Sequence, residues 1–131
     1  MKVLALDYGP ARTGVAVSDP TGTIARPLGV VERAATEPGL AELARLIAEE
    51  GADRVVVGLP LTLRGERGEQ ARVTEAFVEA LRGATRVPVE IFDERFTTDL
   101  AEQTPASSAT DARAAAHLLS SYLAWSSAPR S

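Results

Sequence analysis

The segment Arg54 to Gly58, Arg-Val-Val-Val-Gly, restricts the fold of this chain more than any other part of its sequence. Its central residues are β-branched and apolar, and the run has the length of a single strand. A strand of this kind is buried on both faces of a sheet, which requires helices on both sides. We therefore expect an α/β domain in which helices cover both faces of the sheet.

An amphipathic helix precedes this strand. It begins with the start signal Thr36-Glu37-Pro38, and its pattern stops at Gly51. The apolar residues at helical spacing are Leu40, Leu43, Leu46 and Ile47. This strand, helix, strand unit is expected to have a right-handed crossover.

The remaining segments complete the element order. Strands are predicted at Lys2 to Asp7, Gly14 to Ser18, Ala25 to Glu32 and Val87 to Asp93, and helices at Glu69 to Leu81 and Asp111 to Trp125. Pro27 and Gly29 suit a strand at a sheet edge, and Gly83 marks the end of a helix. The order is βββαβαβα, with a five-stranded mixed sheet. We expect one domain over residues 1–125, a loop at 104–110 and a flexible tail at 126–131.

Composition narrows the chemistry. The 131 residues are 45% hydrophobic and 24% charged, as in an ordinary globular domain. Because cysteine is absent, any metal must be held by oxygen ligands or by His117. The net charge of −4 argues against a broadly basic nucleic-acid-binding surface, although a carboxylate metal site would itself be acidic. With no signal-peptide pattern and no apolar run of ~20 residues, we expect a cytoplasmic protein that does not bind membranes.

Acidic residues stand at the ends of otherwise apolar elements. Asp7 ends the first strand, Asp93 and Glu94 follow the last strand, and Asp111 opens the last helix. Carboxyl ends of neighbouring parallel strands lie together, and oxygen ligands suit Mg²⁺. Each acid also has a structural alternative. These are a turn former for Asp7, an exposed ion pair with Arg95 for Glu94, and a helix N-terminal charge for Asp111.

Three residues of the last helix are expected to be structural. His117 is six positions after Asp111, so the two side chains point to different faces of the helix, and we expect a boundary histidine. Tyr122 and Trp125 are expected to pack in the core or at the helix end, because a base-stacking platform normally has several exposed aromatic side chains.

Several motifs together resemble one family. They are Asp7-Tyr8-Gly9, Arg12 to Asp19, Gly58-Leu59-Pro60-Leu61, Asp93 to Thr98, and Asp111. In this combination and order the chain resembles the YqgF family of RuvC-like Holliday-junction resolvases, also described as bacterial nucleases that mature the ends of pre-16S rRNA. The resemblance implies a ribonuclease H-like fold. It also implies that Asp7, Glu94 and Asp111 are catalytic carboxylates that bind Mg²⁺ or Mn²⁺.

The same resemblance implies a surface that contacts the phosphate backbone of pre-rRNA or branched DNA, or the pre-ribosome. The residues it assigns to this surface are Gly9, Arg12, Thr13, Thr62, Arg64, Arg95 and Thr97. Arginines and backbone amides are suited to this role, while ordinary solvated surface is the alternative for each arginine.

Two segments depart from the family pattern. Where the family usually continues with Asn-Met-Asp-Gly, this chain has Thr62-Leu63-Arg64-Gly65, which removes an amide and an acid. The segment from Thr98 to Asp111 is short and has Thr104 to Ser108 in place of a basic cluster. Both changes bear on substrate grip or catalytic rate.

Three functions are compatible with these patterns. The first is a metal-dependent endonuclease, and the second is a non-catalytic module that binds nucleic acid or the pre-ribosome. The third is a nucleotide-binding domain, because the first two motifs also resemble the phosphate loop of the actin and sugar-kinase superfamily, which needs a second domain. The sequence does not determine whether the substrate is RNA or DNA or whether one metal or two are bound. It also leaves open whether the protein is a monomer or a homodimer.

Overall fold

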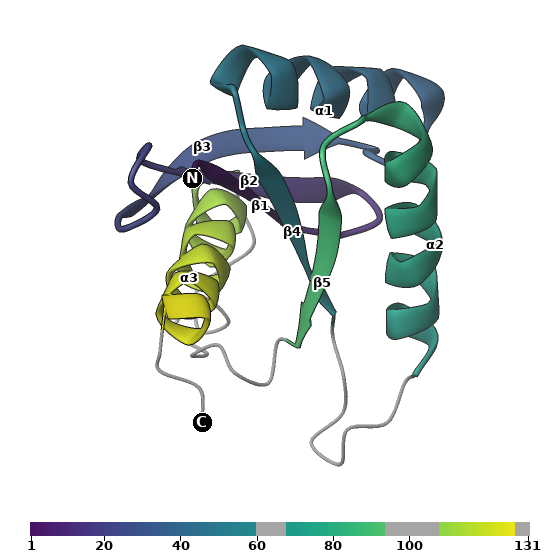
Figure 1. Ribbon diagram of the computed structural model, residues 1–131. Helices are drawn as coiled ribbons and strands as arrows, with labels where there is room; N and C mark the ends of the chain where they lie inside the picture. The colour runs from purple at the N-terminus through teal and green to yellow at the C-terminus, as the bar shows by residue number, and fades with distance from the viewer. Residues whose placement is uncertain (60–67, 94–107, 128–131) are drawn as a thin grey trace.

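The computed structural model describes residues 1–59, 68–93 and 108–127, which build a sheet with helices on both sides (Figure 1). The strands are β1 (Val3–Asp7), β2 (Arg12–Ser18), β3 (Ala25–Glu32), β4 (Arg54–Leu59) and β5 (Val89–Asp93). Their order in the five-stranded sheet is β3-β2-β1-β4-β5. Strands β1, β4 and β5 are parallel, whereas β2 is antiparallel to both β1 and β3. The predicted mixed sheet and the edge position of the third strand are confirmed.

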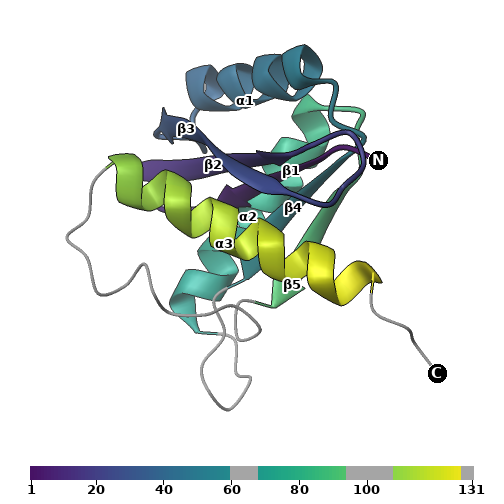
Figure 2. The ribbon, with the colours of Figure 1, turned by 90° about the vertical axis from the view of Figure 1, so that its left-hand side faces the viewer.

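Three helices cover the sheet: α1 (Glu37–Glu50), α2 (Glu69–Ala84) and α3 (Ser108–Ser127). Helices α1 and α2 pack on one face, and α3 crosses the other (Figure 2). The sequence of strand β1 is continuously apolar because its side chains enter both cores. Leu4 and Leu6 enter the core under α1 and α2, whereas Val3 and Ala5 enter the core under α3.

The predicted core faces of the helices are confirmed. Helix α2 buries Ala71, Thr74, Phe77, Val78 and Leu81, and α3 buries Ala115, Leu118, Leu119, Tyr122 and Leu123. Helix α1 begins and ends where its sequence predicts. The Thr36 hydroxyl accepts a hydrogen bond from the Gly39 amide at 3.2 Å, and Gly51 ends the helix in the left-handed conformation at φ 64°.

Other boundaries differ from the prediction. Helix α2 continues to Ala84, so Gly83 lies inside its last turn and does not end it. Helix α3 begins at Ser108, inside the segment predicted as a loop, and extends to Ser127, two residues into the predicted tail. Packing of α3 across β1, β2 and β3 stabilises helical turns that the serine and threonine content alone does not favour. In the described part of the chain, no helix has the length and apolar character needed to cross a membrane.

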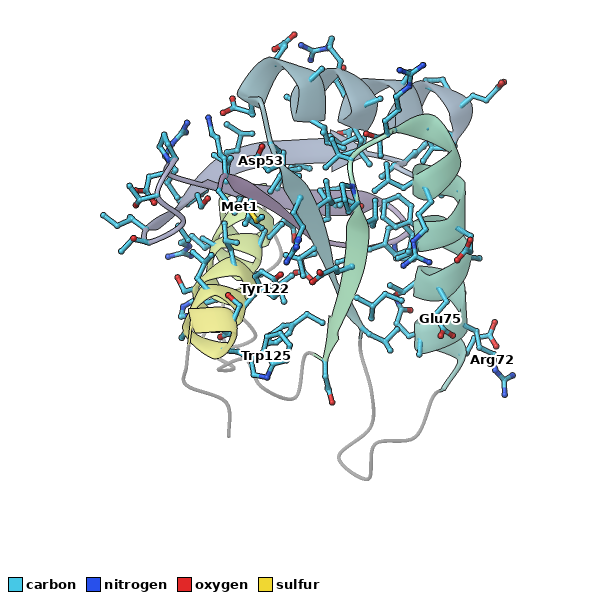
Figure 3. The ribbon with its side chains drawn as sticks, viewed as in Figure 1. Met1, Asp53, Arg72, Glu75, Tyr122 and Trp125 are labelled. Atoms are coloured by element: carbon cyan, nitrogen blue, oxygen red, sulfur yellow. The ribbon has the colours of Figure 1, made fainter. Side chains whose placement is uncertain are left out.

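A polar bridge joins α3 to the sheet far from the carboxyl end of β1. Arg54 Nη1 donates to the Tyr122 hydroxyl at 2.9 Å, and that hydroxyl donates to Glu90 Oε2 at 2.8 Å. Figure 3 shows Tyr122 on the side of α3 that faces the strands. Burial raises the pKa of Tyr122, and the hydrogen bond to Tyr122 raises the pKa of Arg54. The two donors of the bridge, Arg54 and Tyr122, therefore stay protonated at neutral pH.

Removing the hydroxyl from Tyr122 should weaken the fold. Tyr122→Phe leaves Arg54 and Glu90 half-buried without their shared partner, at an expected cost of about 1–2 kcal/mol in the free energy of unfolding. Tyr8→Phe is the matched control among the chain's two tyrosines, since no hydrogen bond of the Tyr8 hydroxyl is found in the described residues. Urea denaturation measures both variants, and equal destabilisation would contradict a role for the bridge.

Candidate active site

Asp7 is the last residue of β1 and lies half-buried at the carboxyl end of the parallel strands. Val3 and Ala5 face α3, and the alternation of a strand places Asp7 on the same face. Val57 of β4 is level with Leu6 on one side and with Ile91 on the other. Asp7 and Asp93 therefore both reach this carboxyl edge of the sheet.

Gly14 explains how the last helix reaches Asp7. It lies opposite Asp7 in the β1–β2 pair, and a Cβ at this position would lie 1.9 Å from the backbone oxygen of Asp111. No side chain fits there, so the first turn of α3 packs directly on the backbone of β2. This contact brings Asp111 next to the strand pair that ends in Asp7. The sequence signal for it was a glycine inside a strand, which indicates close backbone approach.

The Asp111 carboxylate faces Arg12. Arg12 Nε lies 3.0 Å from Asp111 Oδ2, and the side chains are 34% and 25% exposed. Oδ2 is itself buried and accepts no hydrogen bond within the described residues, so its contact with Arg12 is an ion pair only. This oxygen therefore has an ionic neighbour and still has unused capacity to accept a ligand. Its place in the first turn of α3 also favours negative charge through the helix dipole.

The loop between β1 and β2 is held rigidly. The Tyr8 ring stacks on Phe77 of α2 with ring centroids 4.3 Å apart. A Cβ on Gly9 would lie 2.6 Å from the Arg12 carbonyl oxygen, so the turn requires glycine. Thr13 is fully buried, and its hydroxyl makes a long bond of 3.5 Å to the Gly9 carbonyl oxygen. Thr13 thus holds the turn, and the Arg12 side chain is partly exposed to solvent.

Asp19, at the end of the second sequence motif, has a structural role at the hairpin between β2 and β3. Its carboxylate accepts hydrogen bonds from the amides of Ile24 at 2.9 Å and Thr23 at 2.8 Å. The bond from Ile24, together with those from Thr21 and Thr23, lowers the pKa of Asp19. The carboxylate closes the turn in the manner of an Asx turn.

The chemistry of the donors at this edge suits a hard divalent cation. Asp7 and Asp111 offer only carboxylate oxygens, and the buried Oδ2 of Asp111 can accept a further partner. Over residues 1–59, 68–93 and 108–127, no group of three or more Asp, Glu or His side chains is assembled for a metal. Glu94 and the predicted contact residues Thr62, Arg64, Arg95 and Thr97 lie outside the described residues.

The remaining candidates in α3 are placed as the sequence predicts. His117 is half-buried, at the boundary of the core. Tyr122 is buried, and its ring contacts Phe92 edge-on at 5.5 Å between centroids. Trp125 packs against the same phenylalanine near the end of the helix, although 44% of it is exposed (Figure 3).

A family model described as RuvX, Holliday junction resolvase, matches residues 1–125. The chain belongs to the RuvX family. This is the family that the sequence motifs resemble, so the predicted relationship is confirmed.

Curated relatives of this RuvX chain are provisionally named pre-16S rRNA nucleases. A protein from Chloroflexus aurantiacus is 52% identical over 101 residues, which are 77% of this chain and 66% of the relative. The aligned part of this chain thus spans slightly less than two thirds of that relative. A protein from Desulforudis audaxviator is 39% identical over 132 aligned positions, and the match covers 94% of each chain.

Solved structures support the fold. RuvC of Thermus thermophilus, in a complex with a Holliday junction substrate, is similar with a TM-score of 0.61 at 17% identity. The match covers 96% of the RuvX chain and 95% of that chain. The expected RuvC-like, ribonuclease H-like fold is confirmed.

Placing a side chain at position 14 should separate α3 from β2. Gly14→Ala forces Cβ into the Asp111 backbone, and we expect a loss of about 2 kcal/mol or more in the free energy of unfolding. Gly29→Ala in the edge strand is the matched control, because no atom lies within 4 Å of a Cβ there. Urea denaturation of both variants measures the difference. If Gly14→Ala were as stable as Gly29→Ala, the close packing described above would be wrong.

Proposed function

We propose that this RuvX chain is a metal-dependent endonuclease that hydrolyses phosphodiester bonds in structured nucleic acid. The observation that supports it best is the packing of Asp111 on Gly14, opposite Asp7, at the carboxyl edge of the sheet. Two acids far apart in the sequence thus stand on neighbouring backbones. Family membership adds a nucleic-acid substrate to this geometry.

Asp7, Glu94 and Asp111 would hold Mg²⁺ or Mn²⁺. When bound, such a cation supplies Lewis acidity to the scissile phosphate and to an attacking water. Asp7 contributes a carboxylate on a buried strand with little freedom to move. Asp111 contributes one whose backbone is fixed against Gly14. A metal site held on rigid elements keeps its geometry when the substrate binds.

The rigid loop after β1 would contact the nucleic-acid backbone. Gly9 keeps the turn tight, and Arg12 presents a guanidinium beside the Asp111 carboxylate. Arg33 lies beside this loop, because its backbone amide donates to the Ala11 carbonyl oxygen at 3.0 Å. It is exposed and adds a second cation. These two guanidinium groups are suited to contact phosphates. By family resemblance, Thr62, Arg64, Arg95 and Thr97 complete this surface, and Thr13 supports it from inside.

Pre-16S rRNA and a Holliday junction are the two substrates to compare. The names of the relatives point to the first, and the family description points to the second. The protein should cleave at least one of them in Mg²⁺ or Mn²⁺ and neither in excess EDTA. The ratio of the two cleavage rates, together with the solution mass, identifies the natural substrate class and the oligomeric state.

Asp7→Asn should abolish cleavage. The variant removes one charged metal ligand without changing side-chain size, and a loss of several kcal/mol of stabilisation corresponds to at least ~100-fold in rate. Asp53→Asn is the control, because Asp53 is exposed and accepts a hydrogen bond from the Lys2 amide at 2.8 Å, which asparagine can also accept. Single-turnover cleavage of labelled substrate measures both.

Two outcomes would overturn the proposal. Cleavage that survives in Asp7→Asn would place the chemistry elsewhere in the chain. Salt-sensitive binding of either substrate, without cleavage and with no effect of metal or of Asp7→Asn, would instead indicate a non-catalytic nucleic-acid-binding module.

A further inference from the structure

The ion pair between Arg12 and Asp111 joins two groups that the proposed function assigns to different ligands. Asp111 would hold a cation, and Arg12 would contact a phosphate. In the structure the two side chains contact each other, with Arg12 Nε 3.0 Å from Asp111 Oδ2. The guanidinium therefore occupies a position beside Asp111 that a cation would need. The carboxylate likewise occupies a position beside Arg12 that a phosphate would need.

We propose that Arg12 and a divalent cation compete for the Asp111 carboxylate, so that cation binding releases the guanidinium to the nucleic-acid backbone. This inference rests on the proposed function and deepens it. It makes Arg12 a positioning residue whose contact changes during the binding cycle. It also makes the binding of metal and of nucleic acid mutually dependent.

A cation and the Arg12 guanidinium at the same carboxylate would repel each other. This oxygen is buried and already has the guanidinium as its neighbour. A cation held by this carboxylate would add a second positive charge beside the guanidinium, which lies 3.0 Å from Oδ2. Because the site is partly shielded from solvent, repulsion between the two positive charges is weakly screened.

The Arg12 side chain can move away from the Asp111 carboxylate without a change in the backbone. Its backbone is paired with Glu32 of β3, and the neighbouring Ala11 carbonyl oxygen accepts the Arg33 amide. Only the flexible side chain needs to move, and it is already about one-third exposed. A guanidinium that leaves the carboxylate can present two parallel N–H groups to a phosphate.

The first test measures Mn²⁺ affinity by calorimetry without nucleic acid. If Arg12 competes with the cation, Arg12→Gln should bind Mn²⁺ about two- to fivefold more tightly than the wild type, which is the range expected for loss of a partly exposed ion pair. Arg12→Met keeps the unbranched stem and should behave in the same way, so it replaces Arg12→Gln if that variant does not fold.

Arg113→Gln is the matched control. Arg113 is exposed, lies two residues after Asp111 in the same helix, and removing it deletes the same charge without deleting a contact to the carboxylate. A tightening confined to Arg12 variants supports direct competition. Equal tightening in Arg113→Gln, or unchanged or weaker Mn²⁺ binding in Arg12→Gln and Arg12→Met, would overturn it.

The second test measures coupling. Fluorescence anisotropy with a four-way DNA junction and with a pre-16S rRNA fragment, in Ca²⁺ and under conditions without cleavage, gives nucleic-acid affinity as a function of cation. Wild-type protein should bind at least one probe more tightly as Ca²⁺ saturates, beyond any change seen in Arg12→Gln, because coupling between two ligands is reciprocal. Identical Ca²⁺ dependence in wild type and Arg12→Gln would refute the exchange.

Failure of this inference can be told from failure of the proposed function. If the wild type binds no Mn²⁺, or if Asp7→Asn binds it equally well, both the metal site and the exchange are wrong. If Asp7→Asn loses Mn²⁺ while the Arg12 variants bind it no more tightly than the wild type, only the exchange is wrong.

Discussion

The contact between the first turn of α3 and the backbone of β2 determines where the candidate site can form. At position 14 the two backbones are so close that only glycine fits. The same residue lies opposite Asp7, so one missing side chain brings a helix terminus to the end of a buried strand. Without that approach, Asp7 would be an acid at a strand end with no second acid beside it from α3.

The layered architecture fixes the strand side of this arrangement. Strand β1 is central and has helices over both faces, so its side chains alternate between two cores. Asp7 is the first polar residue in that alternation, at the point where the strand reaches the sheet edge. The strand that carries Asp7 is paired on both sides, with β2 and β4, and the location of Asp7 follows from the same burial that made the strand apolar.

Much of the fold could be predicted from sequence because the elements carry local signals. The apolar strands, the Thr36 cap and the Gly51 stop each indicate an element or a boundary within a few residues.

Boundaries set by tertiary packing could not be predicted, as with Gly83 inside α2 and the early start of α3 at Ser108. Asp7 and Asp111 could be chosen as candidates from their places at element ends. The burial of Thr13 and the pairing of Arg12 with Asp111 depend on residues distant in sequence.

The bridge of Arg54, Tyr122 and Glu90 has a mechanical consequence for the opposite end of α3. The helix is fixed near its start by the Gly14 contact and near its end by hydrogen bonds to β4 and β5. These restraints oppose both sliding of the helix along its axis and rotation about it. Asp111 therefore keeps its position whether its carboxylate faces an arginine or another cation, and the exchange of partners requires no motion of the scaffold.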